Sequence, residues 1–263
     1  MNKMGKINFK FLINNTEWQA PHLQRMEYER NLHVLHNLRQ HGIEVKDGIK
    51  TLDDDDIDYL TAKDAWRVSV DTRAGLNSET VEQHYRQSFQ RSNAFWKDHP
   101  FSQDLPMRKS TCQMLVEGIS LQKYMQTVAE MTHDARLLLH GHPEHMNAIE
   151  TPEKIIGIEP FGTYGTPTLC IVKHTEVAEM GPQIQNDADP LFPIKTAGKA
   201  YLLDGTTEIN SPFHQYRPTE NGLEAKLAVY WPATVPDEIV TGHSLHLAME
   251  FYESLVYAET QLK

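Results

Sequence analysis

Three histidines and a glutamate lie within six residues, in the segment HGHPEH at positions 140–145. Neutral imidazole is the commonest protein ligand for metal ions. In extended backbone, side chains alternate between two faces, so His140 and His142 would point to the same side. Pro143 disfavours helical backbone at the residue before it, which supports an extended conformation there. The spacing therefore predicts that two imidazoles of this segment bind one metal ion together.

The hypothesis is a site for one divalent metal ion, whose identity the sequence does not specify. Catalytic metal sites commonly have three protein ligands and leave one position for water or substrate. Ligands from distant strands can complete such a set, and two more histidines lie on or at the end of expected strands. The five candidate ligands are His140, His142, His145, His174 and His214. Glu144 would then orient a ligand or act as the general base.

The same residues also have an explanation that needs no metal. His140 falls in the last turn of an expected helix, where a histidine interacts favourably with the helix dipole. The two histidines after it would then be ordinary loop residues. With 14 histidines in 263 residues, chance clusters of this kind are also common. The rival hypothesis is a non-catalytic small-molecule-binding or assembly protein without a metal.

Two further histidines, His243 and His246, are one helical turn apart near the C-terminus. Residues three positions apart are neighbours on a helix surface, so this spacing permits both side chains to bind one ion. It fits the packed face of an amphipathic helix equally well, and the sequence does not decide between the two.

The charge balance excludes some classes of partner. The chain has 36 acidic and 25 basic side chains, which give a formal net charge of −11. Such a protein is repelled by nucleic-acid phosphates and by anionic membrane surfaces, so neither is an expected partner. The expected partner is a small-molecule ligand or substrate, and the chain could also form a homo-oligomer.

Cysteine usage and hydropathy indicate the compartment. Cys112 and Cys170 are the only cysteines, and they form no C-x-x-C motif. The sequence has no apolar run of about 18 residues, and its first residues lack the apolar core of a signal peptide. These features predict a cytoplasmic protein that needs no disulfide.

The first part of the chain, about residues 1–150, is predicted to be mainly helical. Apolar residues recur every three or four positions in three segments, at 23–38, 81–96 and 121–139. An alternating run at 7–13 predicts one strand before them. The last of the three helices would end at the histidine segment.

The second part, about residues 151–240, is predicted to be rich in strands. The dipeptides Asp204-Gly205 and Asn221-Gly222 favour the positive φ angles of tight hairpin turns. Residues 176–196 have no periodicity and predict a long loop. A helix at 243–262 is expected to end the chain.

Together these elements predict one α+β domain over residues 1–263. Its mostly antiparallel sheet comes from the C-terminal half and is packed by N-terminal helices and a C-terminal helix. The leading hypothesis for function is a small-molecule enzyme, assisted by a divalent metal ion, with its site between the helical and sheet halves near residues 140–145.

Overall fold

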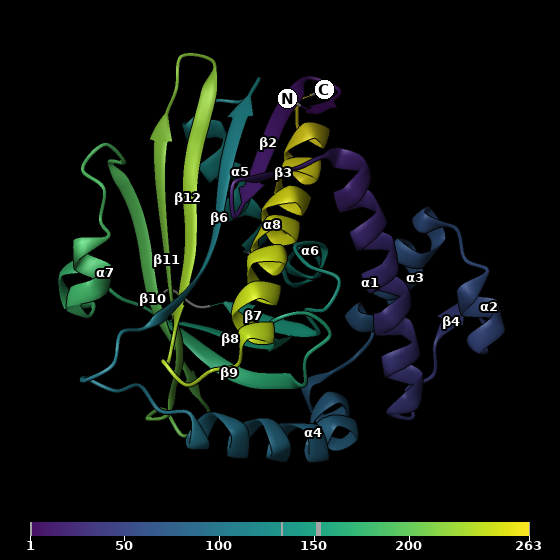
Figure 1. Ribbon diagram of the computed structural model, residues 1–263. Coiled ribbons are helices and arrows are strands. Elements are labelled where there is room, and N and C mark those ends of the chain that lie inside the picture. Colours follow the sequence, from purple (N-terminus) through teal and green to yellow (C-terminus); the bar gives the residue numbers. More distant parts are fainter. Residues whose placement is uncertain (1, 133, 151–153, 263) are drawn as a thin grey trace.

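The computed structural model describes residues 2–132, 134–150 and 154–262 and has the predicted α+β architecture (Figure 1). The strands are β1 (Asn2–Met4), β2 (Ile7–Ile13), β3 (Thr16–Trp18), β4 (Lys46–Asp47), β5 (Lys50–Thr51), β6 (Arg108–Glu117), β7 (Asn147–Glu150), β8 (Lys154–Pro160), β9 (Pro167–His174), β10 (Ile194–Leu202), β11 (Glu208–Pro218) and β12 (Gly222–Trp231). The helices are α1 (Ala20–Gln40), α2 (Asp54–Asp58), α3 (Ala62–Ala74), α4 (Ser78–Asp98), α5 (Leu121–Thr132), α6 (Ala135–His140), α7 (Pro182–Asn186) and α8 (Asp237–Thr260), with a 3₁₀ turn at Val177–Glu179.

A large antiparallel sheet forms the frame of the molecule. Its strand order is β1-β2-β6-β12-β11-β10-β9-β8-β7, and β3 pairs with β2 at one edge. Most of the sheet comes from residues 108–231, as the sequence predicts for the C-terminal half. The small β4–β5 hairpin lies apart from it.

Both predicted hairpins are present, but their glycines have different roles. Gly205 has a φ of +71°, as a tight turn after Asp204 requires. Gly222 does not have a positive φ, so the prediction for that residue was wrong. A Cβ atom on Gly222 would lie 2.0 Å from the carbonyl oxygen of Val116. The glycine is therefore needed for the close approach of β12 to β6.

Strand β6, an inner strand of the sheet, was not predicted from the sequence. It pairs with β2 on one side and with β12 on the other. Cys112, Met114 and Val116 alternate on its buried face, and all three belong to the main core. Because β6 joins β2 to β12, the N-terminal part of the chain contributes to the same sheet as the C-terminal part.

Helix α8 packs across one face of this sheet and positions the candidate site. It contacts β2, β6 and β12, and α1 and α5 flank it (Figure 1). The helix begins at Asp237, directly after Pro236, and not near residue 243 as expected. Asp237 and Glu238 in its first turn interact favourably with the helix dipole.

The N-terminal end of α8 lies against the turn between β8 and β9. A Cβ atom on Gly242 would lie 2.7 Å from the backbone nitrogen of Thr163. A Cβ atom on Gly162, whose φ is +91°, would meet the backbone of Ile239 at 3.0 Å. These two glycines bring α8 close to the strand that carries Glu159.

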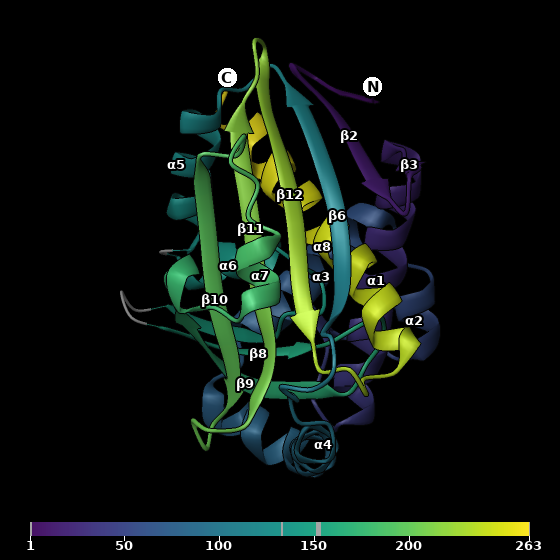
Figure 2. The same cartoon turned by 60° about the vertical axis from the view of Figure 1, so that its left-hand side comes forward.

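Residues 176–196 are not the unstructured loop that was predicted. They contain a 3₁₀ turn and α7, which lies on the opposite face of the sheet from α8 (Figure 2). Met180 and Ile184 are buried there against Ala228 and Tyr230 of β12. Pro182 in the first turn of α7 has the φ that a helix start requires. The buried apolar residues of this segment are too few and too far apart in the sequence to form a periodic pattern.

Replacing Leu227 with alanine is expected to destabilise the protein by about 2–5 kcal/mol. Leu227 lies in the middle of β12, is 1% exposed, and belongs to the main core between the sheet and α8. The change would leave a cavity there. Chemical denaturation of both proteins measures the difference, and an unchanged midpoint would show that this face of β12 does not pack as described.

Candidate metal centre

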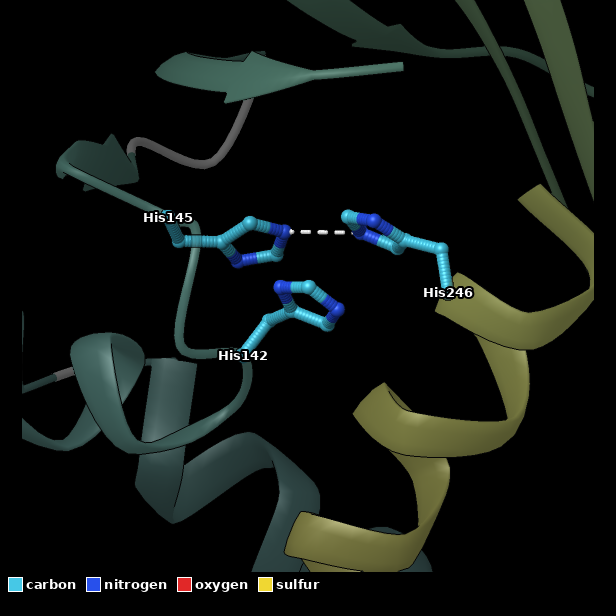
Figure 3. Close-up of side chains that lie close together, drawn as sticks. All are labelled: His142, His145 and His246. Atoms are coloured by element: carbon cyan, nitrogen blue, oxygen red, sulfur yellow. Dashed lines mark hydrogen bonds between the residues drawn. The ribbon is translucent and has the colours of Figure 1, made fainter. Parts of the chain in front are cut away.

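The structure contains a buried group of three histidines that could hold a metal ion. His142 and His145 come from the loop after α6, and His246 comes from α8 (Figure 3). One nitrogen of each ring lies within 4.8 Å of the others. Residues about 100 positions apart in the sequence thus meet at one point, between the helical part and the sheet.

Arg73 of α3 holds the loop that carries His142 and His145. Its buried Nη1 donates hydrogen bonds to three backbone carbonyls, those of Leu139, His142 and His145, at 3.1, 3.1 and 2.5 Å. A loop fixed at three carbonyls by one side chain has little freedom to move. The two histidines are therefore preorganised.

The closest set of possible ligand atoms includes a carboxylate. His145 Nε2 lies 3.1 Å from His246 Nε2 and 2.8 Å from Glu159 Oε2. The distance from His246 Nε2 to the same oxygen is 3.9 Å. Ligand atoms at about 2.0–2.2 Å from one zinc ion are roughly 3–3.5 Å apart. Only small side-chain shifts would thus let these three groups bind one ion.

The chemical composition of this set fits a catalytic metal better than a structural one. Two imidazoles and one carboxylate leave at least one position of a four-coordinate ion open to water or substrate. Metalloenzymes use the same ligand types for zinc and for iron. His145, His246 and Glu159, which could bind one metal ion together, are called the metal triad below.

His142 has a different environment from the other two histidines. Its Nε2 lies 2.9 Å from Nη1 of Arg30, and its Nδ1 accepts a hydrogen bond from the Glu144 backbone N–H at 3.1 Å. A guanidinium and an amide N–H can only donate. A neutral imidazole has only one acceptor nitrogen, and the Glu144 N–H already occupies Nδ1 of His142, while Arg30 lies beside Nε2. A metal ion at His142 would have to displace one of these two neighbours.

Ring stacking indicates that His142 orients the ring of His246. Its ring lies parallel to that of His246, with centroids 3.7 Å apart and an interplanar angle of 13°. The His243 ring also stacks with that of His246, with centroids 4.7 Å apart and an interplanar angle of 18°. These contacts fix the plane of the His246 ring while its Nε2 faces His145.

The protonation states of the histidines follow from their surroundings. Burial, together with the charges of nearby histidines, holds the pKa of His142 and of His246 well below the usual value, so both are neutral. Burial also disfavours charge on His145, but the hydrogen bond to Glu159 and the charges of Glu159 and Glu250 together outweigh it and raise the pKa of that imidazole. Burial would raise the pKa of Glu159, and the same hydrogen bond lowers it. His145 and Glu159 thus form a hydrogen-bonded pair in which each group favours the charged form of the other.

We expect zinc affinity to fall at acidic pH. His145 must lose its proton to bind a metal, and its raised pKa strengthens the competition from protons. Below that pKa, each unit of pH should weaken binding about tenfold. Isothermal titration with zinc at pH 8, 7 and 6 measures this slope. Affinity that does not depend on pH would show that His145 is not a ligand.

The triad borders a cavity of about 270 Å³. Its walls are largely apolar and come from β8, β9, β11, β12 and α8. His243 and His246 line it, and each has a buried Nδ1 with no hydrogen-bond partner among the described residues. Buried polar atoms normally have partners, so these two nitrogens indicate a place for a polar ligand.

Glu250 lies one helical turn after His246 and borders the same cavity. Burial raises the pKa of this carboxyl to about 7. A general acid or base works best when its pKa is near the working pH. Glu250 also lines a smaller neighbouring cavity of about 140 Å³, together with Tyr124 and Tyr216.

The structure brings together only part of the predicted ligand set. His142 and His145 meet, and His214 lines the cavity without joining the three-histidine group. Burial lowers the pKa of His214 to about 4, so its ring is neutral. His174 is exposed at the end of β9.

His140 does not face the same site as His142. The extended backbone predicted for this segment is absent, because α6 continues through His140 and Gly141 still has helical φ and ψ angles of −61° and −29°. The His140 ring packs edge-on against Trp66, at 4.8 Å between centroids, and borders a separate groove.

Glu144, the predicted general base, forms a buried ion pair. Its Oε2 lies 2.8 Å from Arg30 Nη1, and both side chains are at most 2% exposed. Burial raises the pKa of Glu144, and the charge of Arg30 opposes this shift. Glu144 does not line the cavity at the triad. The carboxyl groups that border this cavity are those of Glu159 and Glu250.

No protein-family model matches this chain, and no curated protein matches it. Along the described part of the chain, no helix is both long enough and apolar enough to cross a membrane.

Proposed function

We propose that the protein is a small-molecule enzyme that uses one divalent metal ion bound by His145, His246 and Glu159. The observation that carries this proposal is the convergence of their three ligand atoms at 2.8, 3.1 and 3.9 Å beside a cavity. Protein metal sites of this composition, with an open position, bind water or substrate.

The groups around the cavity have complementary chemical roles. A metal ion there would polarise a carbonyl group or lower the pKa of a bound water. Glu250, with a pKa near 7, would transfer the proton that such a reaction requires. The apolar walls would exclude bulk water and so strengthen the electrostatic interactions inside.

The cavity also limits the substrate. Its volume of about 270 Å³ lies near the lower end of the range for ligand pockets. The mostly apolar lining fits the carbon skeleton of a small molecule. The unpartnered nitrogens of His243 and His246 fit one or two polar groups on it.

Untargeted metabolite profiling tests this proposal. The protein purified without a histidine tag is reconstituted with zinc, manganese or iron and incubated with a small-molecule extract. We expect metal-dependent loss of at least one compound, measured by mass spectrometry. Glu250→Gln is the matched variant, and it should retain the metal but lose most of the turnover.

Two outcomes would contradict an enzymatic function. Compound loss that is identical with and without metal would remove the role of the ion. A protein that binds one metal ion and one compound without converting it would support the rival hypothesis of a non-catalytic binding protein.

A further inference from the structure

A second cavity lies beside the C-terminal part of α8, whereas the metal triad lies beside the N-terminal part of this helix. It is a groove of about 630 Å³ between α1, α3 and α8. No residue that lines the cavity at the triad also lines this groove. The lining residues used below are Glu27, Lys63, Trp66, His140, Glu253 and Tyr257.

Two glutamates in the groove have no ion-pair partner among the residues that the structure describes. Glu253 is 4% exposed, and its Oε1 is buried without a hydrogen-bond partner. Glu27 enters the same groove from α1. A buried carboxylate normally has a cationic partner or several hydrogen bonds.

The nearby cations do not supply that partner. Arg73 acts on Glu253 through its charge, but its guanidinium hydrogen-bonds to backbone carbonyls of α3 and of the loop after α6. Lys63 is exposed and forms no ion pair with any residue that the structure describes. The acidic pair therefore remains available to a ligand.

Aromatic side chains form part of the groove wall, and one of its rings carries an unpartnered nitrogen. Trp66 and Tyr257 line it, and the edge-on ring of His140 supports Trp66. The Nε2 atom of His140 is buried and has no hydrogen-bond partner in the described part of the chain. An aromatic face attracts an organic cation through its π electrons.

We propose that this groove binds a small organic cation, with its ammonium group between Glu27 and Glu253 and its apolar part against Trp66. An ammonium group has three N–H donors, which match the free carboxylate oxygens. A hard metal ion would need six or more oxygen ligands, whereas the groove offers two carboxylates among aromatic and aliphatic walls.

The protonation of the acidic pair supports the proposal. Burial raises the pKa of Glu27 to about 7. Burial and the charge of Glu27 raise the pKa of Glu253 well above its usual value, and Arg73 opposes this. Without a ligand the pair holds protons near neutral pH. A bound cation favours the ionised form, so binding should release protons and become tighter as pH rises.

Calorimetric titration with 2-phenylethylammonium tests the proposal, and 3-phenylpropan-1-ol is the neutral probe of similar size. We expect the ammonium probe to bind, the alcohol to bind at least tenfold more weakly, and the ammonium affinity to rise from pH 6 to pH 8. The basic side chains of Lys63 and His140 also face the groove.

Three variants locate the binding site. Glu27→Gln and Glu253→Gln should each weaken ammonium binding at least tenfold, and denaturation midpoints would confirm that both fold. Glu29→Gln removes an exposed carboxylate on the same helix, which pairs with Arg25, and should leave binding unchanged. Equal binding of the alcohol, no effect of either groove variant, or binding of magnesium in place of the ammonium probe would overturn the proposal.

Discussion

Replacing His246 with alanine is expected to lower zinc affinity at least 100-fold. The change removes one imidazole from the metal triad and leaves two ligands, His145 and Glu159. Competition with a chromophoric zinc chelator at pH 8 measures the affinity. Because α8 is held by its apolar contacts with the sheet, the variant should still fold.

Two matched variants test whether the loss of zinc affinity is specific to His246 or follows from the removal of any histidine near the site. His140→Ala removes a ring that borders the other groove and should leave zinc affinity unchanged. His142→Ala removes the ring stacked on His246 and should weaken binding about 10–100-fold, as loss of a group that orients a ligand does. A loss of affinity in His140→Ala equal to that in His246→Ala would place the ion elsewhere.

Replacing Arg30 with methionine is expected to destabilise the protein by about 3–5 kcal/mol. Arg30 is fully buried on α1 and donates to Glu144 and Thr163, and its Nη1 lies 2.9 Å from Nε2 of His142. Without the guanidinium, Glu144 is a buried carboxyl group with no cation beside it. Urea denaturation of both proteins at pH 8 measures the loss.

A double-mutant cycle identifies the source of that loss. Glu144→Gln in the Arg30→Met background removes the uncompensated carboxylate and should restore part of the stability. The penalty of Arg30→Met alone should also shrink between pH 8 and pH 5, because loss of the Arg30 charge, which lowers the pKa of Glu144, lets burial raise that pKa further and favour the neutral carboxyl group. A penalty that is the same at both pH values and in both backgrounds would mean that only packing was lost.

Local patterns predicted the fold class but not every strand. Alternating apolar residues at 7–13 and 223–231 identified two strands of the sheet, and helical spacing identified α1, α4 and α5. In β6, Leu115 lies between Met114 and Val116, so both faces carry apolar residues and the alternation is weak. The pairing of β6 with two distant strands is a tertiary property that the local sequence does not encode.

The candidate site was predictable only where its residues are neighbours in the sequence. His142 and His145 lie in one loop, and the HGHPEH segment drew attention to them. The spacing of His243, His246 and Glu250 places all three on one face of a helix, but ordinary packing explains such a face equally well. Glu159 follows the apolar run Ile155, Ile156 and Ile158 in β8, and its position in the sequence did not indicate a metal ligand.

Arg30 was missed although the sequence contains a usable signal. Leu23, Arg30, Val34 and Leu38 follow the helical spacing of the buried stripe of α1. A charged residue at a stripe position predicts a buried partner, here Glu144. Which acidic side chain fills that role follows only from the tertiary structure.

X-ray absorption at the zinc edge of the reconstituted protein tests the metal triad most directly. The account predicts one zinc ion per chain with two imidazoles and at least one oxygen ligand at about 2.0–2.1 Å. His145→Ala and His246→Ala should each lose the scattering of one imidazole. A wild-type spectrum with oxygen ligands alone, or one that neither variant changes, would contradict the assignment of His145, His246 and Glu159 as the metal-binding site.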